Sequence, residues 1–224
     1  MSFVGCGGSM YQASNGARLE LDAAREVNDE DVKKAFDAAP QLPERSRVAY
    51  FTFDDRKADD VGTMLSSLPH VSDTYRIPRL LVTGKRRFEE ASPWEPARAL
   101  SVKQLRLLAA RAHADVLVVF DQGYKGGGLN PLSSFLGLLV PALFVPFLSN
   151  ETESYAQAHV IDVRNGYLYA EVNAEHKGGA EFATLYARTP NDIFEQAWPE
   201  LLGRVRVRIE DALASGRTPS KPTN

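Results

Sequence analysis

The stretch that decides the fold, Ala114 to Gln122, reads Ala-Asp-Val-Leu-Val-Val-Phe-Asp-Gln. Its five consecutive apolar residues, Val116 to Phe120, lie between two aspartates. An unbroken apolar run of this length is typical of a strand that is buried on both faces. Such a strand needs cover on each side, so the run predicts the centre of a sheet with helices packed against it.

Helical periodicity surrounds this strand in the sequence. Apolar residues recur along one face over residues 28–38, 58–68, 101–113 and 191–214, and each of these ranges predicts a helix. Ser101 and Gln104 have the spacing of a capping box at the start of the third helix. Residues 203–209 alternate arginine with apolar side chains as a strand would, but the helical stripe covers more residues. We therefore expect a helix there, bent at Pro199 and Gly203.

Further strands are indicated on both sides of the central one. Residues 47–54 and 75–82 predict two strands, and Pro78 within the second places that strand at a sheet edge or a bulge. Gln157 to Val172 predicts a hairpin around Asn165-Gly166, with a two-residue loop. Together these elements predict an α/β fold, in which a small mixed sheet with flanking helices forms a two-layer or three-layer sandwich with a C-terminal helix.

The chain of 224 residues is long enough for one packed domain with tails. We assign a single α/β domain to residues 46–214, with an apolar insertion over residues 126–150. Residues 1–45 hold the N-terminal segment, a tether and the first helix. Residues 215–224 contain proline, serine and lysine, and we expect them to form a disordered tail.

Composition argues against several classes of protein. Lysine and arginine total 26, aspartate and glutamate total 29, and the formal net charge is -3. No basic run alternates with aromatic residues, so no nucleic-acid partner is expected. The single cysteine excludes an internal disulfide and a thiolate metal cluster, and the four histidines lie far apart in sequence. We expect no metal site and no cofactor.

Familiar catalytic motifs do not occur. Gly126-Gly127-Gly128 lacks the Lys-Ser or Lys-Thr of a phosphate loop, so we interpret it as a flexible hinge. No serine lies in a Gly-x-Ser-x-Gly elbow. Asp121 and Gln122 end the predicted central strand, where sites of α/β proteins often lie, and they are the candidates for a polar site. The chain is not expected to be an enzyme.

Four aspartates lie close together at the end of the first predicted strand and the start of the helix after it. Acidic side chains favour a helix N-terminus electrostatically, and this is the interpretation that we prefer. A cation site is the alternative. The four residues are Asp54, Asp55, Asp59 and Asp60.

The segment from Gly126 to Asn150 carries no charged residue, and Leu129 to Leu148 within it nearly reaches the length of about 20 residues that spans a bilayer. Its three prolines, at 131, 141 and 146, argue against one continuous helix. Two further interpretations stay open: a helical turn or two packed on the sheet before an extended segment, or a mobile loop that touches a membrane or a partner. We expect Phe144 and Phe147 to stay exposed and to form the partner surface.

The N-terminus contains a short pattern that matters for location. Phe3-Val4-Gly5-Cys6 is similar to a bacterial lipobox, in which a small residue precedes a cysteine that becomes acylated. The residues before Cys6 are too few for a signal peptide, so a lipobox here implies a natural start upstream of Met1. The alternative is a free cysteine near a disordered terminus.

Taken in order, these features resemble a family of bacterial proteins called rhombotarget lipoproteins. The resemblance covers roughly residues 46–212, and the order of its motifs carries it. The motifs are the strand 47–53, Arg76-Ile77-Pro78, the helix from Ser101, the strand 115–122 ending Phe-Asp-Gln, Asn130-Pro131-Leu132 with the apolar run after it, and 158–169 with its Asp-Val-Arg-Asn-Gly turn.

The resemblance implies a fold, a location and a role. The family looks related in fold to the curli-secretion pore subunit and to activators of penicillin-binding proteins, which are small α/β sandwiches that bind other proteins. It implies an acylated, palmitate-type anchor at Cys6, and Gly7 after it implies retention in the outer membrane, facing the periplasm. The tail 215–224 lacks the Gly-Gly motif, apolar helix and basic cluster of a rhombosortase substrate, so processing of that kind is not expected.

The leading hypothesis is therefore an outer-membrane-anchored periplasmic lipoprotein that serves as a non-enzymatic binding or adaptor module for an unidentified envelope protein. The first alternative is an oligomeric, membrane-inserting or pore-type subunit that uses residues 129–148, and a homo-oligomer is compatible with both. The second alternative is an enzyme acting at Asp121, which needs a further catalytic group that the sequence does not name.

Overall fold

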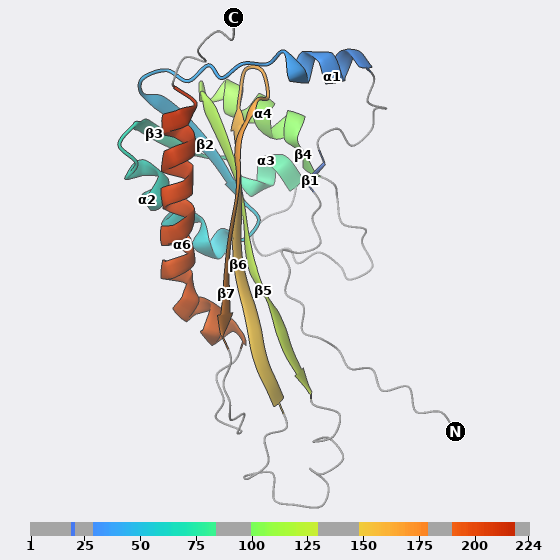
Figure 1. Cartoon of the computed structure of the whole chain (residues 1–224), viewed down its shortest axis with the longest axis vertical. Coiled ribbons are helices and arrows are strands. Elements are labelled where there is room, and N and C mark those ends of the chain that lie inside the picture. The colour runs from blue at the N-terminus through green and yellow to red at the C-terminus, as the bar shows by residue number, and fades with distance from the viewer. Residues whose placement is uncertain (1–18, 21–28, 84–99, 130–147, 179–189, 218–224) are drawn as a thin grey trace, which may run out of the picture. The chain divides into compact units, whose positions relative to one another are not determined.

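A computed structural model describes residues 19–20, 29–83, 100–129, 148–178 and 190–217 (Figure 1). Strands and helices alternate along the first half of the chain, and two long strands, a third strand and a long helix follow. The elements are β1 (Leu19–Glu20), α1 (Asp29–Phe36), β2 (Ser46–Thr52), the 3-10 helix η1 (Asp55–Lys57), α2 (Ala58–Ser66), β3 (Val71–Arg76), α3 (Arg79–Thr83), β4 (Leu100–Ser101), α4 (Val102–Arg111), β5 (Val116–Leu129), β6 (Leu148–Asp162), β7 (Leu168–Gly178) and α6 (Pro190–Ser215).

The main sheet has five strands in the order β3-β2-β5-β6-β7. β2 pairs in parallel with β3 on one side and with β5 on the other, and the β2–β5 register places Val48 opposite Val116 and Thr52 opposite Phe120. β6 and β7 are consecutive neighbours joined by a turn, which makes the sheet mixed. The α/β class, the mixed sheet, the flanking helices and the C-terminal helix are confirmed.

The chain divides into two compact units. The larger unit takes residues 14–121, 157–173 and 202–224, and the smaller takes residues 1–13, 122–156 and 174–201. β5, β6, β7 and α6 each contribute residues to both units. The assignment of residues 46–214 to a single domain stays a prediction.

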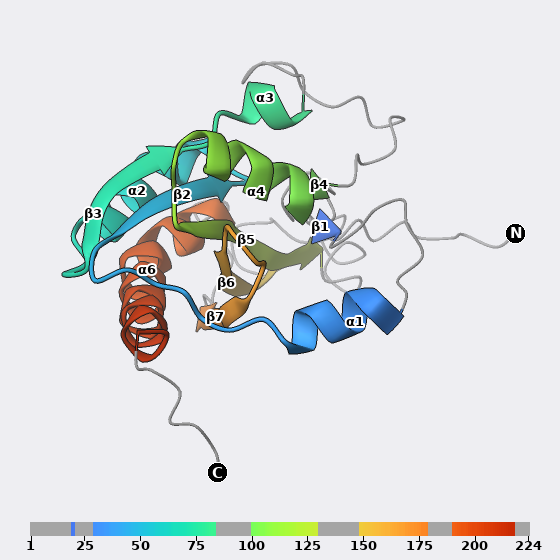
Figure 2. The same ribbon diagram turned by 90° about the horizontal axis from the view of Figure 1, so that it is seen from above.

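The larger unit has three layers around the strands β2 and β5. Residues 116–120 of β5 are almost fully buried, as the apolar run predicted. One face of the strands packs against α4, beside which β2 and β5 lie in Figure 2. The opposite face meets α2, where Gly62 lies against the ring and hydroxyl of Tyr50. The α4 face is built from Ala49, Phe51, Phe53, Ile77, Leu100, Val102, Leu105, Ala109, Ala114, Leu117, Val119, Ile161 and Val163.

The second strand differs from its prediction. The strand β3 runs over residues 71–76, and residues 79–82, which the sequence assigned to the same strand, lie in the short helix α3. Pro78 explains the change, because it lacks an N–H for the ladder and its fixed φ suits the start of a helix. Its carbonyl accepts a hydrogen bond from Leu81 N at 3.0 Å. The predicted edge position is confirmed, because β3 is the first strand in the sheet order.

Two local predictions on either side of β5 are also corrected. Ser101 precedes α4 in an extended conformation, but its side chain makes no capping hydrogen bond, so the capping box is wrong. Residues 126–128, interpreted as a hinge, belong to β5, which continues to Leu129. The strand continues because its neighbour in the sheet is the long strand β6.

The hairpin between β6 and β7 has a wider turn than predicted. Asp162 N donates to Tyr167 O at 2.8 Å, so the turn extends from Val163 to Gly166. A two-residue type I′ turn needs positive φ at both Asn165 and Gly166. Gly166 has φ 79°, but among the described residues the one non-glycine with positive φ is His113, so Asn165 does not adopt that conformation. The predicted two-residue loop, which would pair Val163 with Leu168, is therefore wrong.

The C-terminal segment forms one helix from Pro190 to Ser215. α6 contains Pro199 and Gly203 and shows no strand over residues 203–209. The helices predicted over 28–38, 58–68 and 101–113 are confirmed as α1, α2 and α4, and the strand over 47–54 is confirmed as β2. In the ranges that the structure describes, no helix has the length and apolar character needed to cross a membrane.

Candidate functional site

The carboxyl ends of β2 and β3 carry the charged residues that the sequence placed at the start of a helix. Asp54 caps η1 and accepts a hydrogen bond from Arg56 N at 2.9 Å. Its carboxylate also binds the Arg56 guanidinium, with Nη2 to Oδ2 at 2.7 Å and Nε to Oδ1 at 3.1 Å. Burial alone would raise the pKa of Asp54, but the hydrogen bonds and charge of Arg56 outweigh it and hold that pKa below its usual range.

Arg76, the last residue of β3, joins two more aspartates to this end of the sheet. Its Nη2 lies 2.5 Å from Asp55 Oδ1, and its Nη1 lies 3.4 Å from Asp59 Oδ1. Burial raises the pKa of Tyr50 on the neighbouring strand, while the charge of Arg76 acts in the opposite direction. Arg56 pairs with Asp54, and Arg76 pairs with Asp55 and Asp59, so the Arg76 side chain joins the end of β3 to η1 and α2. The sequence did not predict these arginine pairs, and the interpretation of the four aspartates as a favourable helix N-terminus stays a prediction.

Asp121 and Gln122, the candidate polar residues, lie inside β5 and do not end it. The β2–β5 pairing closes at Thr52 opposite Phe120, and Phe53 N donates to Phe120 O at 3.2 Å. Asp121 is half-buried, and Gln122 is buried with 2% of its surface exposed. β5 then continues to Leu129, so the expectation that the strand ends at these two residues is wrong. Cys6, Phe144 and Phe147 lie outside the described residues.

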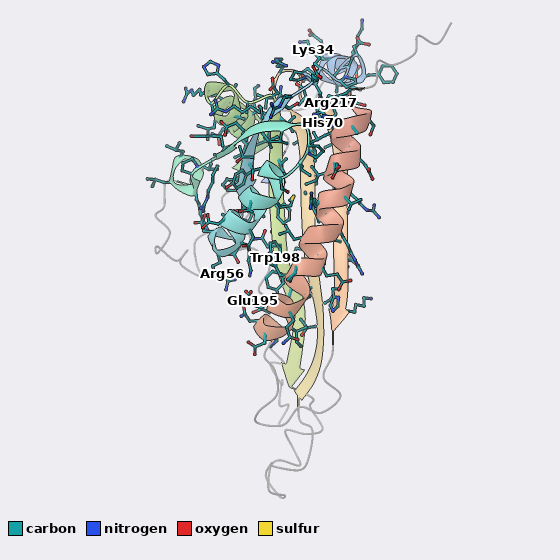
Figure 3. The ribbon with its side chains drawn as sticks, turned by 90° about the vertical axis from the view of Figure 1, so that its left-hand side faces the viewer. Lys34, Arg56, His70, Glu195, Trp198 and Arg217 are labelled. Carbon is teal, nitrogen blue, oxygen red and sulfur yellow. The ribbon has the colours of Figure 1, made fainter. Side chains whose placement is uncertain are left out.

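The described part of the smaller unit contains three buried polar residues, and of these the sequence had indicated Gln122 alone. Gln122, Thr152 and Ser154 are buried, and the hydroxyl oxygens of Thr152 and Ser154 have no hydrogen-bond partner in the part of the chain that the structure describes. Aromatic rings lie in the same unit: Tyr124 is 5.9 Å from Phe194 between ring centroids, and Phe194 is 5.7 Å from Trp198 (Trp198 is labelled in Figure 3).

An alternating pattern in the sequence of β6 could have identified Thr152 and Ser154 as buried residues. Thr152, Ser154, Ala156, Ala158 and Val160 occupy alternate positions of β6, and all are buried. The alternation is of the kind that one covered face of a strand produces. The pattern is hard to recognise in the sequence, because its first two residues are small and polar and the buried face is not apolar throughout.

A charged contact also lies in the smaller unit. His176 Nδ1 lies 3.1 Å from Glu200 Oε2, and this contact joins β7 to α6.

At the amino end of the sheet, the structure brings together residues that no sequence pattern connected. Asp162 is almost fully buried, and its carboxylate accepts hydrogen bonds from Arg164 N at 2.8 Å, Asn165 N at 3.1 Å and Tyr169 Oη at 2.6 Å. Arg164 Nη2 binds Asp115 Oδ1 at 2.7 Å, directly before β5. The hairpin turn is thus bonded to the start of the central strand.

Residues 39–43, which we call the strap, cross this end of the larger unit. Asn165 Nδ2 donates to Ala39 O at 2.7 Å, and Gln41 N donates to Tyr169 Oη at 3.1 Å. Arg217, which follows α6, donates from Nε to Pro43 O at 3.1 Å and from Nη2 to His70 O at 3.4 Å; Figure 3 shows Arg217 and His70 next to each other. The strap therefore fixes the chain between α1 and β2 to both the hairpin turn and the C-terminal segment.

Among groups of histidine, cysteine, aspartate and glutamate in the described ranges, none has three or more members placed to hold a metal ion. The charged cluster lies in the larger unit, and the buried polar residues Gln122, Thr152 and Ser154 lie in the smaller one. What the arrangement defines is a mixed α/β sheet protein with a long strand pair, β5 and β6, whose connection lies outside the described residues.

No family model and no curated protein matches the chain. Among solved structures, a PelC dodecamer from Paraburkholderia phytofirmans aligns with 11% identity over 75% of this chain and 93% of that chain, with a TM-score of 0.37. A hypothetical protein from Chlamydia trachomatis aligns with 15% identity over 76% and 99%, with a TM-score of 0.38. The lipoprotein GNA1162 from Neisseria meningitidis aligns with 11% identity over 70% and 96%, with a TM-score of 0.32. Because these scores and identities are low, the similarities assign the chain neither a family nor a function.

Proposed function

We propose that this chain is a non-enzymatic binding protein of the bacterial cell envelope, held to the outer membrane on its periplasmic side by an acylated Cys6. Its partner is another envelope protein, and its binding surface is the apolar connection between β5 and β6. The tripeptide before Cys6, the glycine after it and the resemblance to rhombotarget lipoproteins support the anchor.

One observation carries the binding role. β5 and β6 are neighbours in the sheet, yet the chain between them runs over residues 130–147. Neighbouring strands need only about 2 to 5 residues to connect, and a much longer connection inside a compact fold is usually functional. This connection has no charged residue. Apolar surface of that extent is seldom left bare, so we infer that residues 130–147 contact a partner, with Phe144 and Phe147 at the centre of that contact.

Site-specific photo-crosslinking in the native envelope tests this proposal. A benzophenone side chain is introduced at Phe144 in one variant and at Val207 in another, because Val207 is an exposed apolar residue on α6 that provides a matched control. We expect position 144 to give a crosslinked protein band that position 207 does not give, and mass spectrometry of that band names the partner. Equal crosslinking at both positions contradicts the proposal.

A second candidate function is favoured by the composition of the same connection, because residues 130–147 carry no charged side chain. In this alternative the apolar connection inserts into a membrane when several copies assemble. Crosslinking from position 144 into lipid or into a second copy of the chain, in place of a different protein, supports the alternative.

A further inference from the structure

The first helix, α1, presents an apolar face that the rest of the described structure does not cover. Val32 is 57% exposed and Phe36 is 89% exposed. They are four positions apart on the helix, Ala35 lies beside them and is also exposed, and none of the helix residues is buried. The sequence predicted that these three residues share one face, and the structure shows that this face points away from the core.

A helix of this kind needs a partner surface. α1 has 8 residues, and isolated helices shorter than about 12 to 15 residues are marginal in water. Its own surface supplies one exposed ion pair, Lys34 Nζ to Glu30 Oε1 at 3.0 Å, which contributes little because both side chains are solvated. That pair lies on the side of the helix opposite Val32 and Phe36, so the helix is amphipathic. Its charged residues are Asp29, Glu30 and Asp31 against Lys33 and Lys34, which leaves a net charge of -1.

The strap holds α1 at one place on the larger unit. Ala39 lies three residues after Phe36, and its carbonyl accepts the hydrogen bond from Asn165. Gln41, two residues further on, is bonded to Tyr169. The apolar face of α1 is therefore kept at the surface by hydrogen bonds outside the helix.

We propose that Val32, Ala35 and Phe36 insert into the interface of the lipid bilayer and form a second membrane contact beside the acyl anchor. This inference rests on the proposed anchor at Cys6. Leu19 pairs with Leu100 in the two-stranded sheet, and the chain from Cys6 to Leu19 spans at most about 45 Å even when fully extended. The anchor thus limits the distance between Leu19 and the bilayer surface to about 45 Å. Lys33 flanks the apolar face, where its alkyl stem can lie along the interface with the ammonium group in water.

The size of the face favours lipid over a second copy of the chain. Phe36 offers at most about 150 to 250 Å² of surface, and Val32 offers less. A specific protein interface buries about 1,000 Å² or more in total. A bilayer contact needs no such area, because a protein that the anchor already holds at the membrane meets the bilayer at a high effective concentration.

Lipid quenching of a fluorophore on α1 tests the proposal with the acylated, full-length protein in vesicles of phosphatidylethanolamine and phosphatidylglycerol. Cys6 is the one cysteine of the chain, and acylation blocks its thiol, so Ala35→Cys creates a single site for a nitrobenzoxadiazole dye. The matched control carries the dye at Val207→Cys on α6. Both positions are exposed, so neither change disturbs the core.

We expect brominated acyl chains to quench the dye at position 35 more strongly than the dye at position 207. Adding Phe36→Ser to the Ala35→Cys variant should reduce quenching to the control level. Equal quenching at the two positions, in protein that still floats with the vesicles, overturns the inference and leaves the anchor intact. A dye at position 35 that is shielded from water but is not quenched by brominated lipid also overturns the inference. That result would indicate that a protein covers this face of α1. Labelling of a second thiol in protein that fails to float overturns the anchor, and this inference with it.

Discussion

Val118 lies at the middle of the central strand, and its side chain is fully buried. It pairs with Tyr50 of β2 in the parallel register, and its neighbours along β5 are equally buried. A carboxylate at this position would lose its hydration without gaining a partner, because the strand is covered on both faces.

We therefore expect Val118→Asp to lower the free energy of unfolding by about 3 kcal/mol or more. Val207→Asp places the same charge on an exposed position of α6 and should change stability by about 0.5 kcal/mol at most. Urea denaturation followed by circular dichroism measures both. Similar transition midpoints for the two variants would show that β5 is not at the centre of the fold.

Tyr169 is the second residue whose behaviour can be tested alone. Burial raises its pKa, and so does the hydrogen bond that its hydroxyl donates to the Asp162 carboxylate. The folded protein therefore keeps the phenol proton at a pH where the unfolded chain, with a tyrosine pKa of about 10, loses it. This contribution to stability is complete below about pH 10 and is lost as the pH rises through the higher folded pKa.

The stability difference between the wild-type protein and Tyr169→Phe should accordingly stay constant below about pH 9 and shrink above about pH 10. Urea midpoints for the two proteins at a series of pH values measure it. Tyr50 also has a raised pKa, but it is present in both proteins and does not affect the difference. A gap that widens at high pH would contradict the assigned hydrogen bond between Tyr169 and Asp162.

At the scale of single elements, two glycines in the larger unit should respond in opposite directions to the same change. Gly166 closes the β6–β7 turn with φ 79°, and a Cβ there would lie 2.7 Å from Arg106 Nη1. That guanidinium cannot easily retreat, because it donates to Val163 O and to Arg164 O. Gly203 lies inside α6, and a Cβ there would meet nothing within 4 Å.

Gly166→Ala should destabilise the protein by about 1 to 2 kcal/mol, because the left-handed conformation strains any residue with a Cβ. Gly203→Ala should stabilise it by about 0.5 to 1 kcal/mol, because alanine loses less backbone entropy in a helix. Thermal unfolding of the two single variants measures the contrast. A loss of stability in Gly203→Ala would indicate that α6 needs flexibility at this position.

At the scale of the whole molecule, the location of the apolar connection between β5 and β6 separates the proposed functions. If residues 130–147 bind a partner protein, the chain with Cys6→Ser should remain soluble and monomeric without detergent. If those residues insert into a membrane on assembly, detergent should be needed for solubility, or should increase the mass of the particle. Size-exclusion chromatography with light scattering, with and without detergent, distinguishes these outcomes. Aggregation that only detergent prevents would replace the adaptor proposal with the membrane-inserting one.

The sequence by itself determined those helices and strands whose pattern is contained in one short stretch of residues. The apolar run 116–120 identified the buried central strand, because five buried positions in a row suit no exposed structure. α6 was also predicted from its sequence, although residues 203–209 fit both a helical stripe and a strand-like alternation. Val205 and Ile209 are fully buried while Val207 between them is 58% exposed, which is the spacing of a helix face and not of a strand.

Only the tertiary structure decided the hairpin turn, the strap and the buried polar positions, because their causes lie far apart in the chain. Asn165-Gly166 favours a two-residue loop, but Arg106 of α4 binds the carbonyls of Val163 and Arg164 and supports the wider turn. Nothing in residues 39–43 signals that Asn165, Tyr169 and Arg217 bind them. The burial of Thr152 and Ser154 likewise depends on which elements cover β6, and hydroxyl side chains carry no local sign of that cover.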